Sequence, residues 1–184
     1  MLSLLGKIKS VVSFTSTTPD DDDTFRWKYI DLDNELVEEI KSIYLKNLPS
    51  NPDQFQVLDL KIPDILGKPV FCSRLIYSPP NFNPSYGHKD PRNGSSFVVN
   101  IPLINCEDSV TTLYKSNKNF KKLYYGTELI EILSINDTES IDSYSLTRPI
   151  MFNTRIFHAV RNFSDKPRLA ISLQFKTNPI EWIQ

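Results

Sequence analysis

The clearest candidates for catalytic or metal-binding residues in this chain are its two histidines. The 184-residue sequence contains only His88 and His158, and His88 stands two positions before Asp90 in the segment GHKD, 87–90. In an extended segment, residues i and i+2 point to the same side, so His88 and Asp90 can converge while Lys89 points away. Two imidazoles and one carboxylate on one face of an octahedron can bind Fe(II) and leave the opposite positions open. The pattern therefore predicts a metal site built from His88, Asp90 and His158.

A second group of candidate residues follows His158. Arg168 comes ten residues later and opens the run RLAISLQF, 168–175. If this run is a strand, Arg168 and Ser172 share one face and the large apolar side chains share the other. An arginine and a serine on one face suit a carboxylate, because the guanidinium fork binds it bidentately and the hydroxyl adds a hydrogen bond. The spacing therefore predicts an acid-binding pair.

Short runs rich in β-branched and aromatic residues dominate the chain after residue 70. Turn-rich clusters such as SPPNFNPSYG and NFSDKP separate them, and this pattern is typical of strands joined by turns. The sequence has no alternation of strands with helices and no glycine-rich phosphate loop, so we expect an antiparallel sandwich or barrel. The expected strands are 71–77, 95–103, 110–116, 127–135, 148–154 and 168–175.

One helix is expected ahead of these strands, over residues 33–47. Asp33 or Asn34 can cap its first turn, and the Leu48-Pro49 pair ends it. Its apolar residues recur at helical spacing, and we expect them to pack on the apolar side of 168–175. They are Leu36, Val37, Ile40, Ile43 and Tyr44.

The N-terminal segment and the composition set further limits. Residues 1–24 end in STTPDDDDT, an acidic, turn-rich run that predicts a flexible segment, and 25–184 are expected to form one domain. The net charge of −1 offers no basic field for phosphates, which disfavours a nucleic-acid partner. Cys72 and Cys106 make no disulfide framework, so we expect a cytoplasmic location. No apolar run is long enough for a membrane span, so no membrane association is expected.

The order HKD…H…R, made by 88–90, His158 and Arg168, resembles the HxD…H…R pattern of the 2-oxoglutarate/Fe(II)-dependent dioxygenases. The stretch FNTRIFHAVRNFSDKPRLAISLQF, 152–175, is similar to the last strands of their double-stranded β-helix, or jelly-roll, fold. The likeness extends from about 71 to 177 and suggests the prolyl-hydroxylase-like or the aspartyl/asparaginyl-hydroxylase-like branch. One departure is that Ser172 follows Arg168 by four residues, where some members have two.

The resemblance implies a mostly β jelly roll with the N-terminal helix packed on its outer face. It implies that His88, Asp90 and His158 hold Fe(II), and that Arg168 with Ser172 binds the distal carboxylate of 2-oxoglutarate. Similar enzymes use a Tyr or an Asn on neighbouring strands as a further co-substrate contact. The candidates for that role in this sequence are Asn100, Tyr114 and Tyr77.

The implied reaction consumes O2 and 2-oxoglutarate, releases succinate and CO2, and hydroxylates or oxidatively demethylates a small molecule or a protein side chain. The presence of Asp90 implies an oxygenase in place of a halogenase. Segments 78–87 and 117–147 are expected to shape the substrate entrance. Two alternatives stay open: a cupin-type metalloenzyme that does not use 2-oxoglutarate, and a jelly-roll binding module in which both histidines are incidental. Arg168 and Ser172 distinguish the dioxygenase from the cupin-type enzyme, which has no need of a carboxylate clamp there. The placement of the only two histidines of the chain at both ligand positions argues against the binding module.

Overall fold

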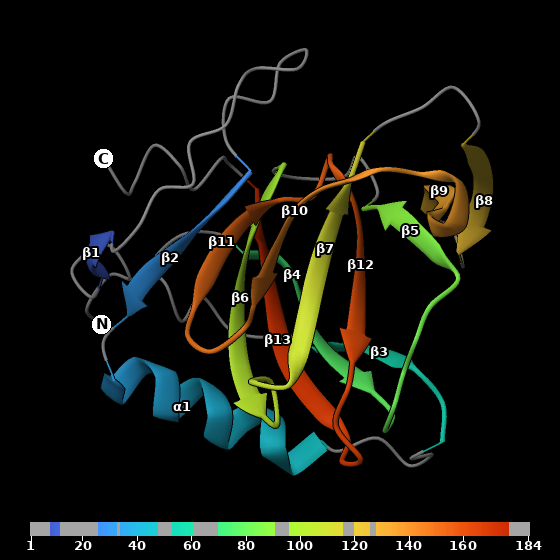
Figure 1. Ribbon diagram of the computed structural model, residues 1–184. Helices are drawn as coiled ribbons and strands as arrows, with labels where there is room; N and C mark the ends of the chain where they lie inside the picture. The colour runs from blue at the N-terminus through green and yellow to red at the C-terminus, as the bar shows by residue number, and fades with distance from the viewer. Residues whose placement is uncertain are drawn as a thin grey trace.

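Two antiparallel sheets face each other in the computed structural model, which describes residues 8–11, 26–32, 34–47, 53–60, 70–90, 96–115, 120–125 and 128–176 (Figure 1). The larger sheet has, in spatial order, β1 (Ile8–Val11), β2 (Trp27–Leu32), β11 (Ile150–Asn153), β6 (Phe97–Ile104), β13 (Arg168–Phe175), β4 (Val70–Ser78) and β3 (Gln56–Leu60). The smaller sheet has β10 (Ser140–Ser145), β7 (Ser109–Tyr114), β12 (Phe157–Asn162), β5 (Tyr86–Lys89), β9 (Glu128–Ser134) and β8 (Lys121–Tyr125).

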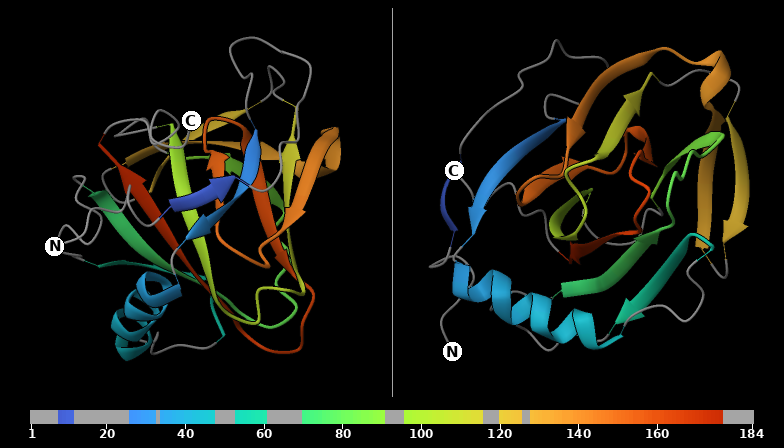
Figure 2. Two further views of the ribbon diagram at one scale, coloured as in Figure 1. Left: turned by 90° about the vertical axis from the view of Figure 1, so that its left-hand side faces the viewer. Right: turned by 60° about the horizontal axis from the view of Figure 1, so that its bottom comes forward.

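Consecutive strands repeatedly change sheets, which is the arrangement of a jelly roll. The chain passes from β4 to β5, from β6 to β7 and from β12 to β13 by crossing between the two sheets. The strands surround a common interior, and α1 (Asn34–Tyr44) lies outside them (Figure 2). The predicted fold, a mostly β jelly roll with an N-terminal helix on its outer face, is therefore confirmed.

The outer face of the larger sheet is apolar and packs on α1. Ile40 and Tyr44 of the helix are buried against the sheet, while Val37 and Ile43 pack at the margin of the same cluster. The helix is shorter than the predicted 33–47, because a 3-10 turn (Leu45–Asn47) replaces its last turn. The strand residues in this cluster include the apolar half of β13, namely Leu169, Ile171, Leu173 and Phe175.

The interior between the sheets contains both apolar and polar side chains. Its apolar part includes Val98 of β6, Leu113 of β7 and Phe152 of β11. A third cluster, with Tyr114 and Phe157, covers the outer face of the smaller sheet. Each face of each sheet therefore has a defined environment, and the parity of a residue along its strand decides whether it faces the interior.

Strands that the sequence did not predict lie mainly at sheet edges. β3, β8 and β10 are edge strands, and β2 is next to the edge strand β1. Edge strands bury few side chains, so they need no apolar run; the first four residues of β8 are all exposed. β8 and β10 flank the predicted strand β9 in the segment 117–147, and all three extend the smaller sheet. A search for apolar runs therefore misses strands of this kind.

The N-terminal segment is only partly described. Within 1–24, Ile8–Val11 forms β1 and pairs with β2. The rest of that segment, with its four aspartates, lies outside the described residues. Among the helices that the structure describes, none has the length and apolar character needed to cross a membrane.

Candidate metal centre and acid-binding interior

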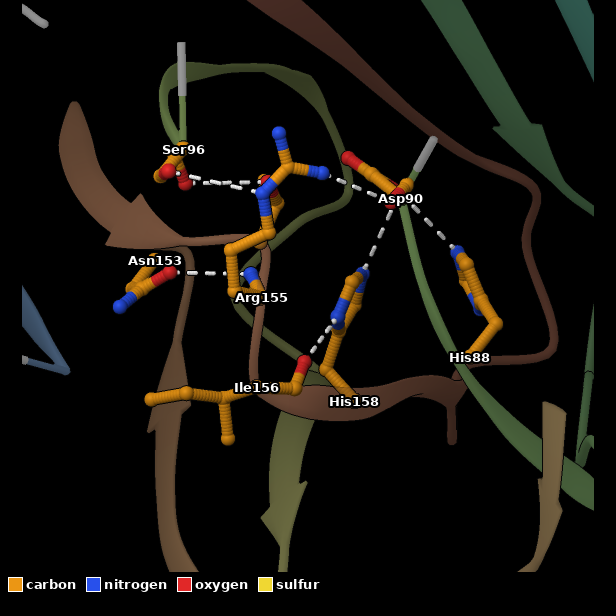
Figure 3. Close-up of polar contacts among 8 residues, drawn as sticks. His88, Asp90, Ser96, Asn153, Arg155, Ile156 and His158 are labelled. Atoms are coloured by element: carbon orange, nitrogen blue, oxygen red, sulfur yellow. Dashed lines mark hydrogen bonds and ion pairs between the residues drawn. The ribbon is translucent and has the colours of Figure 1, made fainter. Parts of the chain in front are cut away.

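The two histidines and Asp90 come together on neighbouring strands of the smaller sheet. His88 of β5 and His158 of β12 are direct partners in the sheet register, and Asp90 follows β5 immediately. Oδ1 of Asp90 lies 3.5 Å from Nε2 of His88 and 3.9 Å from Nε2 of His158 (Figure 3). The structure therefore brings together the three side chains that the sequence predicted to converge.

The spacing of these side chains suits a metal ion. Their ligand atoms all lie within 4.8 Å of one another. Bonds of about 2.1 Å, typical of divalent ions with such ligands, place neighbouring ligand atoms about 3 Å apart. Small side-chain movements would therefore close the set around one ion. Two imidazoles with one carboxylate also match the donor set of Fe(II) sites that keep open positions.

The backbone fixes the protonation pattern of His158. Nδ1 of His158 lies 2.9 Å from the carbonyl oxygen of Ile156, which can only accept, so Nδ1 carries the proton and donates. Nε2 then has its lone pair toward Asp90. Burial, together with the charge of His88, lowers the pKa of His158 to about 4. The ring is therefore neutral near pH 7, as a metal ligand must be.

Asp90 is ionised in this setting, and its neighbour Lys89 points away. Burial alone would raise the pKa of Asp90, but the hydrogen bond with His88, the charge of Arg74 and, at acid pH where they are protonated, the charges of the two imidazoles hold the pKa below its ordinary value. Nζ of Lys89 lies 4.6 Å from the centre of the Phe157 ring, on the outer face of the sheet. The predicted alternation of 88–90 is confirmed.

Arg168 is buried at another part of the same interior. Only 2% of the residue is exposed. Nε donates to Oγ of Ser109 at 3.0 Å, and Oγ of Ser109 donates in turn to the Cys106 carbonyl at 2.6 Å. Nη1 is buried and has no hydrogen-bond partner among the described residues. A guanidinium with a buried, unsatisfied donor is a position where an anionic ligand would complete the hydrogen bonding.

Two more of the predicted residues face the interior. Ser172 lies opposite Asn100 in the pairing of β13 with β6, and both have the parity of the inner residues Ala170 and Val98. Ser172 is buried and Asn100 is half-buried. Oδ1 of Asn100 is another buried atom without a hydrogen-bond partner in the described part of the chain. The interior of the larger sheet therefore presents several polar groups to the space near the candidate metal site.

Tyr77 and Tyr114 lie elsewhere. Tyr77 is opposite Leu169 in the sheet register and belongs to the apolar cluster under α1. Tyr114 is opposite Phe157 and packs in the cluster on the outer face of the smaller sheet. The structure does not bring these two tyrosines together with Arg168, His158 and Asn100.

The structure reveals an inner tyrosine that the sequence analysis did not select. Tyr144 of β10 is buried among the inner apolar residues, and its hydroxyl lies near Thr111 and Asn100. Burial raises the pKa of Tyr144, although the hydrogen-bonding contacts with Thr111 and Asn100 and the charge of Arg168 oppose this effect. In the sequence, Tyr144 is the one aromatic residue of the polar run SIDSYS. Such a run does not indicate a strand with a buried face, so little in the sequence favoured selecting this tyrosine.

Comparisons with known proteins indicate only distant structural similarity. No protein-family profile matches the sequence. No curated protein matches it either. One similar structure is the non-heme alpha-ketoglutarate-dependent carbocyclase SnoK from nogalamycin biosynthesis, with 14% identity and a TM-score of 0.49 over 80% of this chain and 78% of that chain.

Oxalate decarboxylase is also similar in structure, including a variant of the Bacillus subtilis protein. Both matches have 10% identity and a TM-score of 0.38, and they cover 73% of this chain. This chain spans only 29% of the length of those decarboxylases. At this level of similarity, the strand order and the site geometry carry the functional argument.

Proposed function

We propose that this protein is a 2-oxoglutarate- and Fe(II)-dependent oxygenase that hydroxylates or oxidatively demethylates a small molecule or a protein side chain. The observation that carries the proposal is one interior that contains both a His-Asp-His set and a buried arginine with an unsatisfied donor. The His-Asp-His set alone would also suit a metal site without a keto acid, and the arginine alone would suit many anions. Together they suit the two ends of a short keto diacid: the keto-acid end would chelate the metal, and the distal carboxylate would bind the arginine.

The proposed roles follow from the positions of the side chains. His88, Asp90 and His158 would hold the metal, and the carboxylate of Asp90 would neutralise part of its charge. Arg168 would bind the distal carboxylate of 2-oxoglutarate through its unsatisfied Nη1, with Ser172 on the same face of β13 as a further donor. When bound, Fe(II) and 2-oxoglutarate supply O2 activation, with succinate and CO2 as products.

Apolar side chains would shield one side of the site from water. The Phe152 ring packs edge-on against His158 with 4.9 Å between ring centres, and Leu113 is fully buried in the same cluster. His158 is therefore shielded, whereas 39% of the His88 side chain is exposed. Substrate would approach from the His88 side, where solvent already reaches the site.

The pairing of β7 with β12 places His158 and the anchor of Arg168 at different levels of the same two strands. Ser109, which anchors Arg168, lies four residue pairs beyond the pair that contains His158. That interval is about 13 Å of strand. Tyr144 of β10 and Asn100 of β6 also face the interior between the sheets and would provide further polar contacts.

An anaerobic titration of 2-oxoglutarate into the Fe(II)-loaded protein tests the proposal. We expect a visible metal-to-ligand charge-transfer band, because the keto acid would chelate the iron. Iron binding without a band would favour a cupin-type metal site and would refute the role of Arg168. A protein that binds no iron would be a jelly-roll binding module, and the proximity of the histidines would be incidental.

A screen of succinate release then addresses the substrate. We expect one compound or peptide to raise succinate production above the uncoupled rate of the enzyme. The Asp90→Ala variant should lose this Fe(II)-dependent turnover, because the ion would lose its only carboxylate ligand. Unchanged turnover in that variant would remove Asp90 from the metal site.

A further inference from the structure

The turn between β11 and β12 contacts the chain at Asp90 and again at Ser96. This turn, Asn153-Thr154-Arg155, is called here the 153–155 turn. The Asp90 amide donates to the Thr154 carbonyl at 3.2 Å. The Asp90 carbonyl accepts from Nη1 of Arg155 at 3.1 Å (Figure 3). The backbone of the candidate metal-binding carboxylate is therefore held on both sides by neighbouring residues of one turn.

The second attachment point of the 153–155 turn is Ser96. The Ser96 carbonyl accepts from the Thr154 amide at 2.8 Å and from the Thr154 hydroxyl at 3.0 Å. Nε of Arg155 lies 3.5 Å from Oγ of Ser96, at the limit of a hydrogen bond. Arg155 and Thr154 each contact both Asp90 and Ser96, so the 153–155 turn ties these two positions together.

The turn itself is well supported. Asn153 is 3% exposed and Thr154 is fully buried. The Asn153 side chain accepts from the Arg155 amide at 2.9 Å, which fixes the direction in which the arginine leaves the turn. The carbonyl of Ile156, the next residue, orients the ring of His158. One short segment therefore sets the position of two candidate metal ligands, Asp90 and His158.

We propose that Arg155 is a positioning residue that holds the Asp90 carboxylate within metal-binding distance of the two histidines. Arg155 bonds to the backbone carbonyl of Asp90, so both carboxylate oxygens stay available to an ion. Asp90 lies one residue beyond β5, where the sheet no longer restrains the backbone. The inference rests on the proposed function in one respect, namely that the His-Asp-His set binds a metal.

The first test is a Co(II) titration of the purified protein, followed by its visible d–d absorption. The Arg155→Gln variant should bind Co(II) about 10- to 100-fold more weakly, as is typical when an outer partner of a metal ligand is lost. The absorption spectrum of the saturated variant should also change, because the carboxylate would coordinate differently. Arg155→Lys, which can still donate to the Asp90 carbonyl, should recover part of the affinity.

Arg161 provides the matched control. It is also half-buried and also belongs to the β12 region, but it shares its parity with Phe157 and Ala159 on the outer face of the sheet. Arg161→Gln should leave both the Co(II) affinity and the spectrum unchanged. An equal loss of affinity in both variants would show a general effect of removing an arginine and would overturn the inference.

Amide hydrogen exchange in the metal-free protein gives a second readout. Arg155→Gln should increase exchange at the Asp90 amide, which bonds to Thr154, while exchange in β13 stays unchanged. Wild-type Co(II) affinity and an unchanged spectrum in Arg155→Gln would overturn the positioning role while leaving the metal centre intact. If the wild-type protein bound no Co(II), the metal centre itself would fail, and the positioning role would fail with it.

Discussion

The two faces of β13 differ in what they bury. All eight residues of the strand are buried. The face toward α1 carries Leu169, Ile171, Leu173 and Phe175, and these side chains need no hydrogen bonds. The inner face carries Arg168, Ala170, Ser172 and Gln174, and Nη1 of Arg168 has no partner among the described residues.

The difference separates apolar packing from incompletely paired polar groups along one strand. Burial of large apolar side chains contributes about 1.5–3 kcal/mol each to folding, and it requires no ligand. Burial of an incompletely paired guanidinium opposes folding, because the charge loses its hydration. A chain that retains such a group on one face while the opposite face is well packed is consistent with a ligand-binding role for that group.

The largest expected effect is on the inner face. Arg168→Leu should weaken 2-oxoglutarate binding by about 2–5 kcal/mol, which is about 30-fold to more than 1,000-fold, because a buried carboxylate loses its cationic partner. Anaerobic titration of the charge-transfer band measures this change. The free energy of unfolding of the ligand-free variant should not fall comparably, since the guanidinium is incompletely paired. Equal 2-oxoglutarate affinity in the variant and the wild type would contradict the assignment.

The outer face should respond in the opposite way. Ile171→Ala should lower the free energy of unfolding by about 2–5 kcal/mol, because a fully buried side chain is truncated under α1. Urea unfolding measures the loss. The folded variant should bind metal and 2-oxoglutarate as the wild type does. Ser172→Ala on the inner face is the matched change, and it should weaken co-substrate binding more than it weakens folding.

The pH dependence of stability should come from the interior between the sheets, where His158 of β12 lies. Because the pKa of His158 is about 4 in the folded protein and 6.5 when unfolded, the unfolded chain binds more protons between these values. The contribution of neutral His158 to the free energy of unfolding should therefore be fully present above pH 6.5. The free energy of unfolding should fall by up to about 3 kcal/mol as the pH drops to 4. Asp90, whose pKa is also lowered, adds a loss in the same direction below pH 3.8.

Thermal unfolding of the metal-free protein across this pH range measures the effect. Ile171→Ala should be less stable at every pH but should show the same pH dependence, because its face carries no titrating group from the site. His158→Gln should show a flatter profile. A wild-type profile without a decline below pH 6.5 would show that His158 is not buried in its neutral form.

The smallest expected effects distinguish three tyrosines. Tyr77→Phe and Tyr114→Phe should change 2-oxoglutarate affinity by less than about twofold, because both residues lie on outer faces. Tyr144→Phe should weaken it by about tenfold, as expected for one lost hydrogen bond to a charged group. Band titrations of the three variants give the comparison. A larger loss for Tyr77→Phe than for Tyr144→Phe would place the co-substrate outside the described interior.

The sequence by itself determined the features that depend on local spacing. The alternation in 168–175 predicted both faces of β13, and the spacing in 88–90 predicted that His88 and Asp90 converge while Lys89 points away. The helical period of the apolar residues in α1 predicted the face that packs on the sheet. These predictions succeeded because side-chain direction within one element follows from backbone geometry alone.

Only the tertiary structure decided which neighbouring side chains share the interior. Tyr77 faces α1 because it lies opposite Leu169, a pairing between positions that are far apart in the chain. A shift of one residue in that register would have turned Tyr77 inward. The contacts of Arg155 with Asp90 and Ser96, and the burial of Tyr144, likewise arise from strands that come together only in the folded protein. Register between distant strands depends on the packing of the whole sandwich, and no local pattern specifies it.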